Sequence, residues 1–74
     1  MKTIYQVRWK VADEVCEADY LNLESAKKRA ETLSIGFRMA MIGEFKVSEH
    51  RPRELVHKWT YKDGFPHGNE RVAA

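Results

Sequence analysis

The chain has 74 residues, of which 43% are hydrophobic, and its 13 basic and 11 acidic side chains leave a formal net charge of +2. This composition excludes wholesale disorder, and the small net charge excludes attraction to nucleic acid or to an anionic membrane by long-range field alone. The single cysteine, Cys16, excludes an internal disulfide, and no apolar run reaches the roughly 18 residues of a membrane span, so we expect a cytoplasmic protein.

The first predicted elements are two strands that form a hairpin. Residues 3–11 alternate between apolar and polar, and residues 15–20 alternate again after a short polar turn. In an antiparallel hairpin the acidic residues of the second strand share a face with the basic residues of the first: Glu17 and Asp19 beside Arg8 and Lys10. Each such cross-strand pair contributes roughly 0.2 to 1 kcal/mol, so the charges support this register.

A helix is predicted over residues 23–33. Asn22 is a good N-cap, and Gly36 can end the helix in the left-handed conformation. The apolar residues between them recur at helical spacing: Leu23, Ala26, Ala30 and Leu33. We expect this side of the helix to pack on a sheet.

Two further strands are predicted after the helix. Residues 37–47 form a long strand with its large side chains at odd positions, and Gly43 marks a bulge or a close backbone approach within it. A polar connection containing Pro52 leads to the strand LVHKWTY, residues 55–61, which Asp63 and Gly64 end. These two strands form a second hairpin.

The predicted fold is α+β, with the elements in the order β-β-α-β-β. A right-handed crossover by the helix gives one four-stranded antiparallel sheet of strand order 2-1-3-4, with the helix packed on one face. We expect a single domain over residues 1–65 and a flexible C-terminal tail over residues 66–74. LVHKWTY is then an edge strand.

The predicted sheet carries more aromatic surface than one helix can cover. Four strands make a sheet roughly 15 to 20 Å wide, whereas a helix is about 10 Å across. We place seven aromatic side chains on the helix-covered face: Tyr5, Trp9, Tyr20, Phe37, Phe45, Trp59 and Tyr61. The surplus predicts a partner-binding surface of Trp59 and Tyr61 with Arg51 and Arg53 beside them. The alternative is that Phe65 and Pro66 fold back over Trp59 as a lid.

Catalytic and metal-binding patterns are not found in the sequence. His50, His57 and His67 stand at no metal-ligand spacing, and the four glycines are scattered singly, so no phosphate loop is formed. Cys16 lies in a strand near Glu17 and Asp19, which favours a core residue over a reactive thiolate. We expect no enzyme activity, no metal and no cofactor.

Nucleic-acid binding is the alternative function. The face away from the helix is expected to carry five basic residues: Arg8, Lys10, Arg38, Lys46 and Lys58. Sheet modules that bind single strands also need exposed aromatic rings for base stacking, and the predicted parity puts the aromatics on the other face. A sequence-blind contact with the phosphate backbone stays open.

The segment YLNLESAKKRAETLSIGFRM, residues 20–39, resembles small phage-encoded inhibitors of bacterial machinery, including certain type I anti-CRISPR proteins and host RNA polymerase inhibitors. The resemblance lies in the strand, cap, Ala-rich amphipathic helix and return strand, and it carries over no functional residue. It implies binding and blocking of a host protein or nucleoprotein complex without catalysis, in a phage or prophage protein. The excess of basic over acidic residues in this chain differs from the acidic balance of inhibitors that mimic DNA.

A homodimer is the other arrangement that the surplus aromatic surface suggests.

Overall fold

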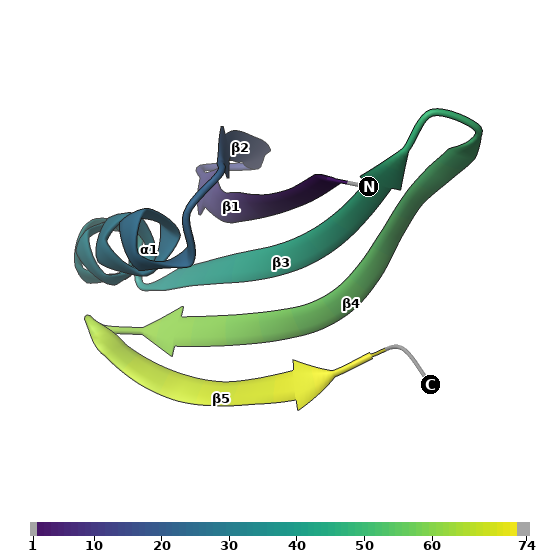
Figure 1. Cartoon of the computed structure of the whole chain (residues 1–74). Coiled ribbons are helices and arrows are strands. Elements are labelled where there is room, and N and C mark those ends of the chain that lie inside the picture. The colour runs from purple at the N-terminus through teal and green to yellow at the C-terminus, as the bar shows by residue number, and fades with distance from the viewer. Residues whose placement is uncertain (1, 73–74) are drawn as a thin grey trace.

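Six elements follow one another in the computed structural model, which describes residues 2–72. They are β1 (Lys2–Val11), β2 (Glu14–Tyr20), α1 (Leu23–Phe37), β3 (Met39–Ser48), β4 (Arg51–Lys62) and β5 (Phe65–Arg71). The strands form one antiparallel sheet of order β2-β1-β3-β4-β5, and α1 packs against one side of it (Figure 1). We call that side the covered face and the opposite side the uncovered face.

The α+β class and the order of the first four strands are confirmed, but the sheet has a fifth strand. Residues 66–71, expected as part of a flexible tail, belong to β5, and Ala73 and Ala74 lie outside the described residues. The reason is the turn: Asp63 (φ 52°) and Gly64 (φ 88°) are both left-handed, as a two-residue type I′ hairpin requires. Asp63 and Gly64 therefore start a hairpin, and β4 is not an edge strand.

The helix is longer than expected. Its N-cap is Asn22, as predicted, and the side chain accepts a 3.2 Å hydrogen bond from the backbone N–H of Ser25. Its last residue is Phe37 rather than Leu33, and Arg38 (φ 73°, ψ −46°), not Gly36, is the residue of positive φ that ends it. The expected strand start at residue 37 is therefore wrong, because a single residue connects α1 to β3.

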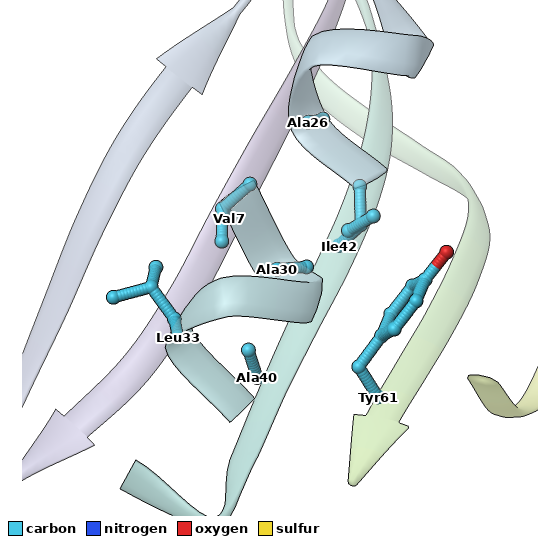
Figure 2. Packing of buried hydrophobic residues seen from close by; sticks show 7 residues of the cluster. All are labelled: Val7, Ala26, Ala30, Leu33, Ala40, Ile42 and Tyr61. Carbon is cyan, nitrogen blue, oxygen red and sulfur yellow. The ribbon is translucent and has the colours of Figure 1, made fainter. Parts of the chain in front are cut away.

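The core lies between α1 and the three central strands β1, β3 and β4 (Figure 2). Val7 and Ile42 are fully buried, and they are register partners on β1 and β3. The rest of the buried hydrophobic cluster is Ala26, Ala30, Leu33, Ala40 and Tyr61. Three of these are alanines, whose small side chains let the helix approach the sheet closely.

The side chains of β3 point to the opposite faces of the sheet from those expected. Val7 pairs with Ile42, and Trp9 pairs with Ala40, so the even-numbered residues of β3 face α1. The large odd-numbered residues consequently lie on the uncovered face: Met39, Met41, Phe45 and Val47. Ala40 and Ile42 of the even-numbered set join the buried cluster beneath the helix, and the odd-numbered set has no helix above it.

Within residues 2–72 no helix combines the length and the apolarity needed to span a bilayer.

Candidate interaction surface

On the part of the uncovered face nearest the β3–β4 turn, the side chains pack over one another. Phe45 and Leu55 are register partners that lean over Gly43, where an added Cβ would lie 2.9 Å from Phe45 Cε2 and 3.1 Å from Leu55 Cδ1. The guanidinium of Arg53 lies 5.9 Å from the centre of the Phe45 ring. Its Nη2 is also 3.4 Å from Asp19 Oδ2 on β2. Gly43 is thus crowded by side chains and not by another backbone, and a register shift follows between Glu44 and Phe45. The contacts of Phe45 shield this half of the face.

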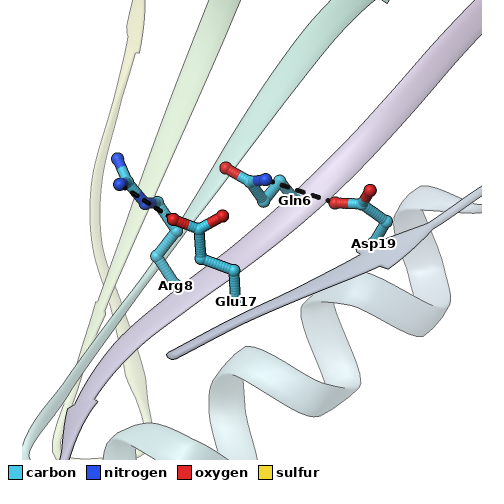
Figure 3. Close-up of polar contacts among 4 residues, drawn as sticks. All are labelled: Gln6, Arg8, Glu17 and Asp19. Carbon is cyan, nitrogen blue, oxygen red and sulfur yellow. Dashed lines mark hydrogen bonds and ion pairs between the residues drawn. The ribbon is translucent and has the colours of Figure 1, made fainter. Parts of the chain in front are cut away.

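Polar contacts join β1 to β2 on the same face (Figure 3). Arg8 Nη2 donates to Glu17 Oε1 at 3.1 Å, as the cross-strand charges predicted. Gln6 Nε2 donates to Asp19 Oδ1 at 3.3 Å. Both partners of the Arg8–Glu17 pair are about half exposed, so the pair contributes at most about 1 kcal/mol to stability. The pair draws the guanidinium of Arg8 toward β2.

The other half of the uncovered face carries an exposed apolar hollow. Val15 of β2 is 52% exposed, Phe37 at the end of α1 is 43% exposed and Met39 of β3 is 45% exposed. Together with Met41, Arg8 and Lys10 they line a hollow of about 530 Å³. We call these six residues the apolar groove.

The apolar groove continues toward the β5 edge of the sheet. A smaller hollow of about 280 Å³ shares Met41 with it and is also lined by Lys58, Thr60 and residues of β5. Phe65, at the start of β5, is 73% exposed and pairs with Lys62, which in turn pairs with Met39. Apolar and basic side chains thus alternate across the strands at this end of the sheet.

The four residues predicted to bind a partner do not form one surface. Tyr61 is only 6% exposed and belongs to the core, so the expectation that it is part of an exposed surface is wrong. Trp59 lies on the covered face opposite Ile42, half-buried, with its ring 6.4 Å from Tyr5 and stacked 4.2 Å from His57. The two arginines lie nearer the β3–β4 turn: exposed Arg51 pairs with Ser48, and Arg53 contacts Phe45 on the uncovered face.

The expected basic face is only partly formed. Arg8, Lys10 and Lys58 lie on the uncovered face, as predicted. Lys46 lies on the covered face instead, where its Nζ donates to Thr3 Oγ1 at 2.9 Å and lies 3.4 Å from Glu44 Oε2. Arg38 is exposed in the connection between α1 and β3, outside the sheet.

Sequence reasoning missed the apolar groove because it placed the odd-numbered residues of β3 under the helix. One signal could have found it. Ala40 and Ile42 alternate with the methionines, and an alanine opposite an alanine-rich helix favours close packing there. The two methionines then have to face the other way.

Burial changes the chemistry of one titratable group. Desolvation in the core raises the pKa of the Tyr61 phenol, and the negative charges of Glu31 and Glu24 raise it further. Cys16 is half-buried on the covered face, opposite Trp9. Among residues 2–72, no three His, Cys, Asp or Glu side chains gather as a metal-binding group.

Comparison with protein-family models, with curated proteins and with solved structures finds no match for this chain. Any function proposed for it therefore rests on the chain's own residues.

Proposed function

We propose that this chain is a small non-catalytic interaction protein that binds and blocks a host protein or nucleoprotein complex through its uncovered face. The observation that carries the proposal is the apolar groove, in which Val15, Phe37 and Met39 are each 43% to 52% exposed. Neighbouring large apolar side chains left in water on a small domain mark a contact surface, because covering them is favourable.

The composition of the apolar groove supports the same proposal. Aromatic residues, Met and Arg are enriched at protein interfaces, and Phe37, Met39, Met41 and Arg8 lie together here. Methionine is unbranched and adapts its shape to a partner. Blocking by occlusion requires no chemical step, and it is the mode of action that the resemblance to small phage-encoded inhibitors implies.

The test is site-specific photocrosslinking with a benzophenone amino acid. One version of the chain carries it at position 39 in the apolar groove, and a control version carries it at position 21, because Leu21 is 73% exposed and does not line the groove. Each is irradiated in bacterial lysate with and without nuclease. We expect a discrete protein adduct from position 39 that unlabelled chain competes away and nuclease does not remove, and no such adduct from position 21.

Two outcomes would overturn the proposal. Position 39 could give no competed adduct, or positions 39 and 21 could give the same adducts, in which case the apolar groove has no special role. An adduct from position 39 that disappears with nuclease favours the second candidate described next.

The second candidate is a nucleic-acid-binding accessory domain. One specific observation favours it: the ring of Phe45 shares the uncovered face with Arg8, Lys10 and Lys58, although the sequence predicts it on the covered face. A cationic face with an aromatic ring can bind a single strand by stacking. Arg53 lies over that ring, however, and a base would have to displace it.

Salt dependence separates the two candidates. Binding of a labelled single-stranded DNA of about 20 nucleotides is measured by fluorescence anisotropy at increasing salt, where each neutralised phosphate contributes about −0.7 to the log–log slope. A nucleic-acid domain gives a steep slope that Lys58→Glu reduces. A protein-binding surface gives no saturable binding of the strand near physiological salt.

A further inference from the structure

Two exposed lysines flank Met39 in the apolar groove. Lys10 lies on β1, the strand between Val15 of β2 and Met39 of β3, and Lys62 of β4 is the register partner of Met39 on its other side. Resting on the proposed function, we infer that the groove receives a segment of the partner protein in which acidic residues flank a large apolar side chain. The apolar side chain packs over Met39 and Phe37, and the acidic residues on its two sides pair with Lys10 and Lys62.

The size and lining of the apolar groove fit a side chain rather than a flat contact. Its volume of about 530 Å³ lies in the range of roughly 300 to 1,000 Å³ that is typical of ligand pockets. Its exposed apolar lining comes from three different elements: Val15 from β2, Met39 from β3 and Phe37 from the end of α1. An inserted apolar side chain would be contacted on several sides.

The charges select an acidic partner. Arg8 is already paired with Glu17, but neither Lys10 nor Lys62 forms an ion pair with any residue in the described part of the chain. Both lysines are exposed. Carboxylates that approach them meet uncompensated positive charge, which speeds association and selects against basic partners.

The same positive charges and the lining of the groove disfavour a second copy of the chain or a nucleic acid as its occupant. A second copy packed groove against groove would bring the lysines of the two copies together. The phosphates of a nucleic acid would pair with the lysines. Among the exposed side chains that line the groove, however, only Phe37 offers a ring for base stacking. Methionine and valine suit an apolar side chain better than a base.

Two defined peptides test the inference on the intact chain. The first is a fluorescein-labelled peptide of about 12 residues that alternates Asp with Leu and Phe, and the second is identical except that every Asp is Lys. Fluorescence anisotropy gives the affinity of each, and amide chemical shifts map where the first peptide binds. We expect the acidic peptide to bind about tenfold more tightly than its basic counterpart, with shifts centred on Val15, Phe37 and Met39.

Matched variants connect that preference to the apolar groove. Lys10→Glu and Lys28→Glu change the net charge equally, but Lys28 is exposed on α1, away from the groove. We expect Lys10→Glu to weaken binding of the acidic peptide about tenfold and Lys28→Glu to leave it within about twofold. Met39→Asp should abolish binding, whereas Leu21→Asp, also at an exposed apolar position, should not.

Equal affinity for the two peptides, or equal effects of Lys10→Glu and Lys28→Glu on that affinity, would overturn the inference. So would chemical-shift changes centred outside the apolar groove. Competition by a short single-stranded DNA, or a dimer in sedimentation that Met39→Asp dissociates, would show that another occupant fills the groove and would overturn it too. Its failure is distinguishable from failure of the proposed function. If the photocrosslinker at position 39 captures a protein partner and Lys10→Glu does not weaken that capture, the chain still binds a partner, but the partner's segment is not acidic.

Discussion

The side-chain oxygen of Ser34 accepts a 2.9 Å hydrogen bond from the backbone N–H of Gly64, 30 residues further along the chain. Ser34 has no exposed surface, and its hydroxyl donates in turn to the carbonyl of Glu31 at 2.9 Å. A second link joins the same two regions, because the backbone N–H of Asp63 donates to the carbonyl of Arg38 at 2.9 Å. The last turns of α1 therefore hold the β4–β5 turn in place.

Replacing Ser34 with Ala tests this link. The Gly64 N–H then loses its acceptor in a partly buried place, so we expect the free energy of unfolding to fall by about 1 to 3 kcal/mol. Thr32→Ala is the control, because Thr32 makes its hydrogen bond on the exposed side of α1 and should change stability by no more than about 0.5 kcal/mol. Urea denaturation followed by circular dichroism measures both. Equal stability of the two variants would show that the Ser34–Gly64 bond contributes nothing.

Two glycine-to-alanine changes should act in opposite directions. Gly64 has a φ of 88°, and an added Cβ would lie 2.7 Å from Ile35 Cγ1, so Gly64→Ala should destabilise the fold by about 1 to 3 kcal/mol. Gly36 lies within α1 with no atom within 4 Å of an added Cβ, and Gly36→Ala should stabilise it by about 0.5 to 1 kcal/mol. Thermal unfolding of the two variants beside the parent chain gives the sign of each effect. A stabilising Gly64→Ala would contradict the turn geometry described above.

Trp59 is predicted to act in stability rather than in partner binding. Its ring packs beside Tyr5 and against the buried core, so Trp59→Ala should lower the free energy of unfolding by about 2 to 4 kcal/mol. Phe65→Ala, at a 73% exposed position, is the matched control and should have a much smaller effect. Denaturation is followed by circular dichroism, because the mutation removes a fluorophore. If Trp59→Ala is as stable as the parent chain, Trp59 is not needed for the fold and is again a candidate for partner binding.

The raised pKa of Tyr61 predicts a loss of stability at alkaline pH. Burial keeps the phenol protonated in the folded state, whereas the unfolded chain ionises near its ordinary value of about 10. The stabilising contribution is therefore fully present below about pH 10 and is lost as the pH rises through the folded-state pKa. We expect the unfolding free energy of the parent chain to fall more steeply above about pH 10 than that of Tyr61→Phe, which has no phenol. Parallel pH profiles would contradict the raised pKa.

Local patterns in the sequence predicted most of the secondary structure. Alternation found the first four strands, although β3 begins at Met39 and β4 begins at Arg51, within the expected polar connection. The Asn22 cap located the start of the helix to the residue. The charges of the first hairpin predicted the contact between Arg8 and Glu17. These features depend on neighbours within one strand, one helix turn or one hairpin, and such short-range interactions are encoded directly in residue order.

The candidate site was not predicted, because it depends on which face of β3 meets the helix. Parity grouped Met39, Met41 and Phe45 correctly, but size alone suggested that they would be buried. Trp59 and Tyr61 did fall on the covered face, yet the core encloses Tyr61 and the half-buried ring of Trp59 packs beside Tyr5. The exposed apolar surface is therefore found at Met39 and not in LVHKWTY.

By itself, the sequence determined the alternating sets of side chains along each strand, the helix that follows the first hairpin and the antiparallel order of the first four strands. Asp63 and Gly64 are a local hairpin signal, but the strand that follows them was seen only in the tertiary structure, because FPHGNER is polar, contains Pro66 and Gly68, and forms a strand through its pairing with β4. The tertiary structure also decided which set of β3 side chains faces the solvent. The reason is packing: the pairs Val7–Ile42 and Ala40–Tyr61 bring the even-numbered side chains of β3 into the core beneath α1, so Met39 and Met41 are left on the uncovered face.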